Sequence, residues 1–497
     1  MYQSWQEEYK RKLMPAEDAV KMVKSGDRVH VPLTTTPGAL IDALQARRDE
    51  LRDVHMDITA PLRYYSMFEP GWEQSFDVTL WNHVMMARQA VDERRLDYLP
   101  LQCTQYAKVM EERGIKPIDC LLVTVCGPND QGFFCFSYDL WYKQSLVKCS
   151  KKIIVEVNNN MPWCHGDTFI HVSQIDAIVD NTLPLLPWEE VVAAVATIED
   201  PEKRQAVQTW MEKLGPSMRT GIAQNYLPYI SGIETKMIHE FARMSGVAEP
   251  SEVDRAIAGH LSTLINDRDC IQIGVGTPSA FMVMCGVFDN KHDLGLHTEM
   301  AARGLARLVE EGVITGKYKT FMPGKAVAAS WTGCHEEEHP ILDHNPKFEL
   351  YDMSYINRPD TYMKNDNMVA INNTVSIDLT GQINSETRFG PMIINGTGGQ
   401  PETHIGCLYS KGGRSIHLLR STAVGGTMST IVGQFEPGTA VTIPKYWADY
   451  VVTEYGIARL MGKTWRERAN ELIAVAHPDF RAELTKQAQK LFYSKGV

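Results

Sequence analysis

The sequence predicts an α/β protein built from two similar open domains with mostly parallel sheets. Short apolar runs, which are typical of strands buried on both faces, alternate with segments of helical periodicity. Small-residue turns follow several of these runs and lead into helices, as in strand–turn–helix units. The chain of 497 residues is also too long for one ordinary hydrophobic core, so two domains are expected.

The N-terminal half opens with a helix and then alternates between strands and helices. Pro15 is favoured in a first helical turn, Gly26 ends the helical pattern, and a β-branched strand follows. The same pattern predicts a helix over 40–51 and strands over 54–62, 121–128 and 151–158.

The middle of the chain has a different character. Residues 184–250 show helical periodicity, several helix breakers and no strand pattern, which predicts a helical connector or insertion. A helix capped by Ser251 and a strand over 270–276 then open the second half. We therefore predict an N-terminal domain over 1–190, a connector over 191–249 and a C-terminal domain over 250–497.

The composition argues against several classes of function. The net charge is −11, with 50 basic and 61 acidic residues, which disfavours a nucleic-acid partner because no basic stripe compensates for it. The sequence shows neither a secretion signal nor an apolar run of about 18 residues, so we expect a cytoplasmic protein with no membrane partner. The ten cysteines include no C-x-x-C pair, which is typical of free thiols in a reducing compartment.

One segment matches a zinc motif. His335 and His339 enclose three glutamates and fit H-E-x-x-H, in which two histidines bind zinc and the glutamate acts as a base. Gly333 before the segment and Pro340 directly after it favour a loop entering a short helix, and adjacent glutamates are typical of a solvated acidic face. We therefore expect no metal site.

Two glycine segments are candidates for binding a ligand. Residues 274–278, GVGTP, follow a strand and precede an apolar helix, so their amides could hold an anion, although the third glycine of a dinucleotide fingerprint is missing. Residues 395–400, NGTGGQ, would let a backbone approach a ligand closely. Taken alone, each segment also fits an ordinary tight turn.

Glu299 is a candidate reactive group. It ends a short apolar run that is typical of a strand, where a carboxylate can act as a nucleophile or base. A solvent-facing glutamate at a turn would give the same pattern.

Taken in order, the segments resemble the acetyl-CoA hydrolase/transferase family, close to the 4-hydroxybutyrate and butyrate CoA-transferases. In the second half, the resemblance is carried by residues 274–276, 294–300, 312–320, 364–386, 396–400, 410–416, 452–463 and 476–481. In the first half, it is carried more faintly by residues 24–29, 34–44 and 127–134.

The resemblance implies two similar CoA-transferase domains and a ping-pong reaction between an acyl-CoA and a small carboxylic acid. Glu299 would attack the thioester to form a mixed anhydride and then a glutamyl-CoA thioester. Asn372 and the backbone amides at 275–276 and 398–399 would stabilise the oxyanions. CoA contacts are expected at Gly274, Val275, Gly276, Thr277, Pro278, Gly396, Gly398, Gly399, Gln400 and Lys411.

The resemblance also implies that CoA is a substrate and that no cofactor is permanently bound. A homodimer or a higher homo-oligomer is expected. An acyl-CoA hydrolase is the alternative enzyme, because water can take the place of the acceptor acid. A catalytically inactive CoA-binding subunit is the alternative from another class. Glu454, an acidic residue in a second motif, is expected to have a supporting role.

The sequence departs from the family pattern at residues 301–304, 401–404 and Arg420. These segments would border the acyl pocket, and Glu402 and His404 replace more apolar residues. We therefore predict an acyl group that bears a polar substituent. The stretch 190–248 is longer than the corresponding linker, and we predict that it shapes the acyl entrance or a subunit interface.

Overall fold

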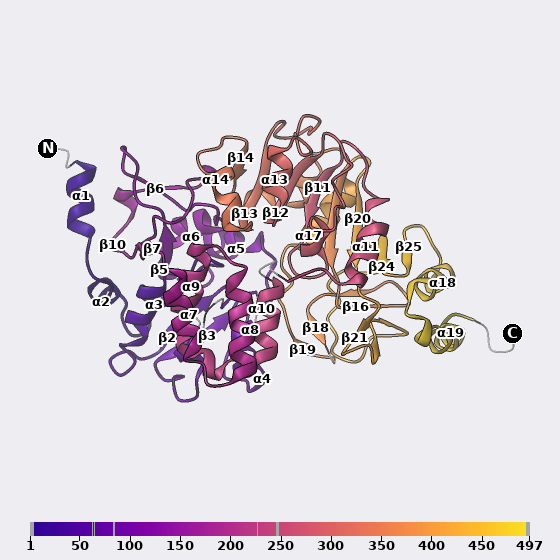
Figure 1. The fold of residues 1–497 in the computed structure, drawn as a ribbon, viewed down its shortest axis with the longest axis horizontal. Helices are drawn as coiled ribbons and strands as arrows, with labels where there is room; N and C mark the ends of the chain where they lie inside the picture. The colour runs from indigo at the N-terminus through magenta and orange to yellow at the C-terminus, as the bar shows by residue number, and fades with distance from the viewer. Residues whose placement is uncertain are drawn as a thin grey trace. The chain divides into compact units, whose positions relative to one another are not determined.

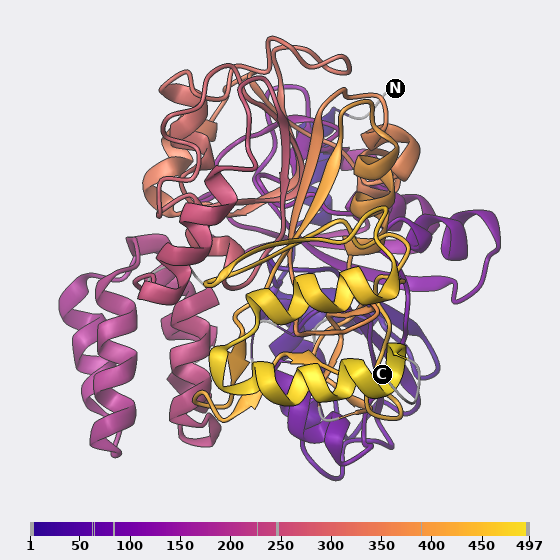
Figure 2. The same cartoon turned by 90° about the vertical axis from the view of Figure 1, so that its right-hand side faces the viewer.

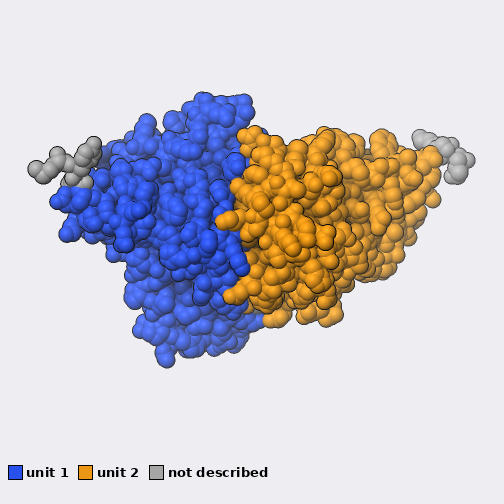
Figure 3. All heavy atoms as spheres, turned by 90° about the horizontal axis from the view of Figure 1, so that it is seen from above, with its two compact units in different colours: residues 1–242, 329–355 blue, residues 243–328, 356–497 orange. Residues whose placement is uncertain are grey.

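The computed structural model describes residues 4–61, 63, 65–82, 85–225, 227–244, 248–388 and 390–493. It is an α/β protein with two large, mostly parallel sheets, as the sequence predicts (Figure 1). The chain divides into two compact units, residues 1–242 with 329–355 and residues 243–328 with 356–497 (Figure 3). The helices of the described residues include none that is long and apolar enough to cross a membrane.

Unit 1 is built on a parallel sheet of seven strands. In order across the sheet, the strands are β10 (Ala177–Asp180), β7 (Ser150–Val157), β5 (Ile118–Val125), β1 (Arg28–Val31), β2 (Val54–Ile58), β3 (Phe76–Leu80) and β4 (Asp97–Tyr98). The strands are apolar and largely buried because helices cover a parallel sheet on its faces. The predicted strands over 54–62, 121–128 and 151–158 are β2, β5 and β7.

The N-terminal helices of unit 1 are shorter than predicted. The helix expected after Pro15 is the short α2 (Ala16–Ala19) followed by a 3₁₀ turn over Val20–Met22. The helix expected over 40–51 is α3 (Gly38–Gln45), because the charged segment after Gln45 forms turns. The other α-helices of the described residues before 186 are α1 (Trp5–Lys12), α4 (Arg88–Asp92), α5 (Gln105–Ala107) and α6 (Lys143–Cys149).

The helical middle segment follows the sheet strands of unit 1. It contains α7 (Trp188–Ala196), α8 (Pro201–Glu212), α9 (Pro216–Asn225), a 3₁₀ segment over Leu227–Gly232 and α10 (Thr235–Met244). Most of this segment, up to residue 242, is part of the compact unit 1, as are residues 329–355. The predicted division at 190 and 249, and the predicted role of the segment at the acyl entrance or a subunit interface, remain proposals.

The rest of unit 1 consists of short elements. The strands are β6 (Phe133–Cys135), β8 (His165–Gly166), β9 (Phe169–His171) and β14 (Phe348–Leu350). The helices between residues 336 and 356 are a 3₁₀ turn over Glu336–Glu338, α14 (His339–Leu342) and α15 (Met353–Ile356). Strand β13 (Ala326–Gly333) carries the chain from unit 2 back into unit 1.

The main sheet of unit 2 carries β25, β24, β20, β15, β11 and β12 in that order. Their bounds are β11 (Cys270–Ile273), β12 (Gly295–Ala302), β15 (Met368–Asn373), β20 (Arg414–Leu418), β24 (Tyr450–Thr453) and β25 (Gly456–Arg459). Only β25 among these six runs antiparallel to its neighbour. The five strands from β24 to β12 repeat the order of β10, β7, β5, β1 and β2 in unit 1.

Helices and three small sheets complete unit 2. The helices are α11 (Glu252–Ser262), α12 (Ser279–Met282), α13 (Leu305–Glu310), α16 (Pro359–Tyr362), α17 (Gln400–Tyr409), α18 (Trp465–Val475) and α19 (Pro478–Phe492). The small strands are β16 (Ser376–Asp378), β17 (Ile383–Asn384), β18 (Thr387–Arg388), β19 (Met392–Ile393), β21 (Thr422–Ala423), β22 (Met428–Ser429) and β23 (Ile431–Val432). Figure 2 shows α18 and α19 in yellow, side by side, and both contribute to one apolar core with β24 and β25.

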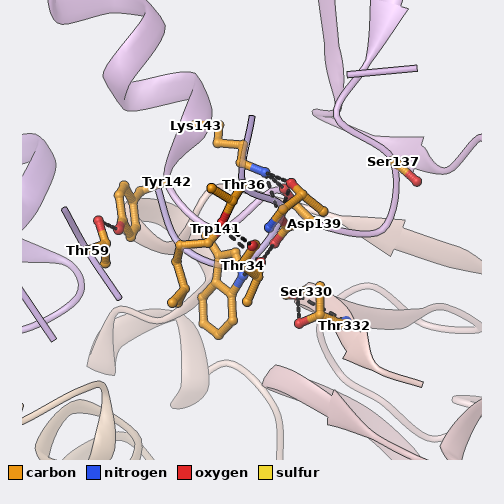
Figure 4. Close-up of polar contacts among 12 residues, drawn as sticks. Thr34, Thr36, Thr59, Ser137, Asp139, Trp141, Tyr142, Lys143, Ser330 and Thr332 are labelled. Atoms are coloured by element: carbon orange, nitrogen blue, oxygen red, sulfur yellow. Dashed lines mark hydrogen bonds and ion pairs between the residues drawn. The ribbon is translucent and has the colours of Figure 1, made fainter. Parts of the chain in front are cut away.

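A buried ion pair fixes the turn after β1 in unit 1. Asp139 and Lys143 are both fully buried, with 2.7 Å between Lys143 Nζ and Asp139 Oδ2 (Figure 4). Asp139 also accepts hydrogen bonds from the hydroxyls of Thr34 and Thr35, and from the amide of Thr35 at 2.7 Å. The indole of Trp141 donates to Thr34 Oγ1 at 3.1 Å. The carboxylate therefore ties the turn to the start of α6.

Removing Asp139 is expected to destabilise unit 1 strongly. In Asp139→Ala, Lys143 keeps its buried position without a counterion, which costs roughly 3–5 kcal/mol in comparable pairs. The midpoint of urea unfolding, followed by circular dichroism, measures the change. The double variant Asp139→Asn, Lys143→Met is the control, because replacing both charges removes the uncompensated ion. An unchanged midpoint in Asp139→Ala would contradict the anchoring role.

Candidate active site

Glu299 lies on β12, the strand next to β11 in the sheet of unit 2. Its side chain is half-buried, whereas His297 two residues earlier is fully buried. Residues two apart on a strand share a face, so both side chains point to the same side of the sheet. The His297 imidazole donates through Nε2 to the carbonyl of Ile356 at 3.0 Å. Burial, with the nearby charge of Lys319, lowers the pKa of His297 to about 3, so the ring is neutral.

Three groups surround the Glu299 carboxylate. Asn357 Nδ2 donates to Glu299 Oε2 at 3.3 Å and to Glu402 Oε2 at 3.1 Å. The Tyr362 hydroxyl donates to Asn357 Oδ1 at 2.8 Å and so fixes which end of the amide faces the carboxylates. The backbone amide of Gly399, at the N-terminus of α17, also interacts with Glu299. An amide side chain and a helix N-terminus therefore hold the carboxylate together.

Gly399 leaves no room for a side chain. A Cβ atom at this position would lie 2.0 Å from Glu299 Oε2 and 2.2 Å from Asn357 Nδ2. Gly399 has φ −98°, which other residues adopt readily, so close approach and not backbone conformation requires glycine here.

The environment of Glu299 raises its pKa to about 7. Burial is the largest cause, because it penalises the charged form, and the negative charge of Glu402 is the second. The hydrogen bonds from Asn357 and Gly399 act in the opposite direction, since they favour the ionised carboxylate. The carboxylate is thus held in place while its basicity is increased.

The first glycine loop, residues 274–278, is fixed against the end of β15. A Cβ atom at Gly274 would lie 2.4 Å from Asn372 Oδ1. Asn373 Nδ2 donates to the Val275 carbonyl at 2.6 Å, and the Ser279 amide donates to Asn373 Oδ1 at 2.9 Å. Gly276 has φ +82°, a conformation that favours glycine. Thr277 and Pro278 complete the turn into α12.

Asn372 is committed to a buried network. Its Nδ2 donates to Gln272 Oε1 at 2.9 Å and to Thr403 Oγ1 at 3.2 Å. These bonds connect β15 with β11 and with α17. The structure therefore brings Asn372 to the edge where both glycine loops lie, and its place as an oxyanion donor stays a prediction.

The second glycine loop joins the same edge of the sheet. Gln400 Nε2 donates to the Asn373 carbonyl at 3.2 Å, and the Thr397 hydroxyl donates to Glu386 Oε2 at 3.0 Å. Gly396 precedes the first of these anchors, and Gly398, with φ +60°, lies between the two. Because the carboxyl ends of parallel strands meet at one edge, the two loops and Glu299 lie at the same edge, the place where open α/β sheets bind ligands.

Lys411 is not part of this arrangement. It follows α17 at its C-terminal end, and a helix of ten residues spans about 15 Å. Its carbonyl accepts from the Asn367 amide at 2.7 Å, just before β15 begins, so it lies near the amino end of that strand. The exposed ammonium group pairs with Asp366 at 3.4 Å. A contact between Lys411 and CoA stays a prediction that would need a ligand reaching from one sheet edge to the other.

Sequence reasoning missed the group that holds Glu299. Asn357 and Tyr362 belong to no motif, and Glu402 stands out in the sequence only as a polar replacement near the expected pocket. The sequence around Asn357 offers one weak signal. Pro359 predicts the start of a helix, but nothing there points to a catalytic role for Asn357.

The other unusual residues of unit 2 have structural partners. Arg420 forms a bidentate pair with the buried Asp254, with Nη2 at 2.7 and 2.9 Å from its two oxygens. Glu454 accepts from the Ser421 amide at 3.0 Å and from the Ser421 hydroxyl at 2.6 Å, in keeping with a supporting role. The imidazole of His404 is fully buried, and its centroid lies 4.2 Å from that of His417.

The zinc-like segment has local structural roles in unit 1. His335 caps the 3₁₀ turn that begins at Glu336, and the His339 ring stacks on Tyr138 at 4.9 Å. Glu336 accepts from the amides of Ser217 and Met218 at 2.7 and 3.2 Å, at the N-terminus of α9. Across the described residues, no group of three metal-ligating side chains is present.

Comparisons with known proteins converge on one family. Residues 1–187 match the acetyl-CoA hydrolase/transferase N-terminal domain, and residues 336–488 match the acetyl-CoA hydrolase/transferase C-terminal domain. The chain is 34% identical to the 4-hydroxybutyrate coenzyme A transferase of Clostridium kluyveri, over 98% of this chain and 100% of the relative. It is 32% identical to the succinyl-CoA:cyclohexane-1-carboxylate CoA transferase of Geobacter metallireducens, over 98% and 97% of the two chains.

Solved structures show the same fold. RipA from Yersinia pestis superposes with a TM-score of 0.78 at 28% identity, covering 99% of this chain and 100% of RipA. The 4-hydroxybutyrate CoA-transferase from Porphyromonas gingivalis superposes with a TM-score of 0.69 at 27% identity, covering 98% and 100% of the two chains.

Proposed function

The chain belongs to the acetyl-CoA hydrolase/transferase family and is a CoA-transferase, and from this premise we propose that it moves CoA between an acyl-CoA and a small carboxylic acid with Glu299 as the nucleophile. One observation carries the proposal. The Glu299 carboxylate lies at the carboxyl edge of the sheet beside two fixed glycine loops, held by Asn357 and the Gly399 amide.

The first half-reaction transfers CoA to the enzyme. A Glu299 oxygen attacks the thioester carbon, the carbon–sulfur bond breaks, and CoA leaves as a thiolate while a mixed anhydride forms. The thiolate then attacks the Glu299 carbonyl carbon, the anhydride carbon–oxygen bond breaks, and the first carboxylate leaves. A glutamyl-CoA thioester remains. The anhydride conserves the activation of the thioester, so the exchange needs no ATP.

The second half-reaction reverses these steps with the acceptor acid. Each tetrahedral step places negative charge on a carbonyl oxygen, which backbone amides can stabilise. The amides of residues 275–276 and 398–399 line the same edge as Glu299 and are proposed to supply this stabilisation. Asn372 is proposed to support the two loops through its bonds to Gln272 and Thr403.

The relatives suggest the substrate class. Their names describe transfer of CoA to or from 4-hydroxybutyrate and cyclohexane-1-carboxylate, so we propose a small organic acid for this chain. The predicted polar substituent on the acyl group remains part of the proposal, as do the cytoplasmic location and the homo-oligomer. Glu402 supports a polar environment directly, since its carboxylate shares Asn357 with Glu299.

Ping-pong kinetics with a trapped intermediate are expected. Initial rates measured at several concentrations of acyl-CoA and acceptor acid should give parallel double-reciprocal lines, because the enzyme is covalently modified before the second substrate enters. Incubation with acyl-CoA and borohydride should yield a reduced Glu299, identified by peptide mass spectrometry. The rates should be the same with and without a chelator.

Intersecting lines without a Glu299 adduct would overturn the proposed mechanism. Release of free acid and CoA at the same rate with and without an acceptor would instead favour the acyl-CoA hydrolase. No turnover and no adduct with any donor would favour the inactive CoA-binding subunit.

A further inference from the structure

Two carboxylates share one amide group beside the proposed nucleophile. Asn357 Nδ2 lies 3.3 Å from Glu299 Oε2 and 3.1 Å from Glu402 Oε2. Asn357 is fully buried and Glu402 is 3% exposed. With Tyr362 bound to its oxygen, the Asn357 amide can only turn its hydrogens towards the two carboxylates. The two acids are therefore fixed close to each other.

Both carboxylates lie at the N-terminus of α17. Glu402 is the third residue of this helix, in the first turn, where free backbone amides and the helix dipole favour a negative charge. Tyr362 from α16 is a further titratable group whose pKa both acids raise. Within the described part of unit 2, no cationic side chain contributes to the pKa of Glu299. The charge of Glu402 and burial therefore both oppose ionisation of Glu299.

We propose that Glu402 is a positioning residue whose negative charge favours the covalent states of Glu299, an inference that rests on the proposed function. Above the pKa of Glu299, the free enzyme holds the ionised Glu299 carboxylate beside Glu402 on one amide. When Glu299 becomes an anhydride or a thioester, its negative charge leaves with the departing carboxylate, and only Glu402 stays charged. The repulsion is present before the half-reaction and absent after it, so it shifts the equilibrium towards the covalent enzyme.

The proposal links two measurable quantities. Protonation and acylation both neutralise Glu299, so the charge of Glu402 affects both equilibria by about the same factor. A change of one pKa unit corresponds to about a tenfold change in an equilibrium constant. If Glu402 acts as proposed, removing its charge lowers the pKa of Glu299 and the equilibrium constant of the half-reaction together.

The test uses Glu402→Gln, which keeps the shape and an acceptor oxygen for Asn357. The half-reaction is followed by intact-protein mass spectrometry, as the fraction of enzyme carrying CoA at set ratios of acyl-CoA to free carboxylate. At a pH above the pKa of Glu299, we expect the equilibrium constant to fall about tenfold in the variant. The pH profile of kcat/KM for the wild type should rise through about 7, because only ionised Glu299 attacks. In the variant, this rise should move about one unit lower.

Two controls separate charge from structure. Glu402→Asp keeps the charge and should stay close to the wild type in both quantities. Glu483→Gln removes one charge from an exposed position of α19 and should change neither. A thioester in the wild type with an unchanged equilibrium and pH profile in Glu402→Gln would overturn the inference alone. No covalent CoA in the wild type would overturn the proposed function instead.

Discussion

Exchange between acyl-CoA and free carboxylate is expected to disappear in Glu299→Ala while the protein stays folded. The carboxylate supplies the covalent intermediate, and the half-buried side chain contributes little to the core of unit 2. Removing it also relieves the repulsion with Glu402, so the thermal unfolding midpoint should not fall. Exchange of labelled acetate or butyrate into the acyl-CoA measures the loss, and circular dichroism checks the fold.

Graded variants test the same role more finely. Glu299→Gln keeps the shape and should be as inactive as Glu299→Ala, because an amide is not a competent nucleophile here. Glu299→Asp withdraws the carboxylate by one methylene, and a misplacement of that order costs on the order of a hundredfold. Glu310→Ala, at an exposed position of α13, is the matched control and should keep full activity. Full exchange by Glu299→Ala would refute Glu299 as the nucleophile.

Gly399→Ala is expected to lower kcat/KM by at least about a hundredfold. The added methyl group would lie 2.0 Å from the Glu299 carboxylate and 2.2 Å from the Asn357 amide, so both must move from their present positions. The backbone at φ −98° accepts alanine without strain, so the variant should fold. Steady-state kinetics together with the fraction of CoA-bound enzyme would show whether the covalent step is the one affected.

The control for this substitution is Gly259→Ala. Gly259 lies at an exposed position within α11, and a Cβ atom there has nothing within 4 Å. Alanine is favoured over glycine inside helices, so this variant should be as active as the wild type and slightly more stable. Equal activity of Gly399→Ala and Gly259→Ala would mean that the Glu299 carboxylate does not need its present position.

Much of the fold follows from local patterns, whereas the site follows only in part. Alternation of apolar runs and helical segments predicts the strands because a parallel strand is buried along its length. The loops at 274–278 and 395–400 are found because glycine marks places where the backbone turns sharply or is approached closely. The helix after Ser251 is also predicted from a local pattern, a serine followed by acidic residues. The structure shows the expected capping box between Ser251 and Asp254.

The residues that surround Glu299 could not be found in this way. Asn357 precedes α16 and Glu402 lies in α17, and only the three-dimensional fold brings them to β12. The spacing of Asn357, Glu402 and Glu299 along the sequence gives no sign that their side chains come together. The contact between Lys411 and CoA that the resemblance implies stays a prediction, and Lys411 lies just beyond the C-terminal end of α17, the helix that begins at Gln400.

The two units share the order of five strands, so positions in one sheet can be matched to positions in the other. When Val31 and Ile273, the last residues of β1 and β11, are matched, the strand pairings bring Thr59 to the place of Glu299. The Thr59 hydroxyl accepts a hydrogen bond from Tyr142 inside a packed core (Figure 4). Acylation of a threonine hydroxyl gives an ester. Unlike an anhydride, an ester does not conserve the activation of a thioester. Under the proposed function, unit 2 therefore supplies the reactive carboxylate, and the matched place in unit 1 holds a packed threonine instead.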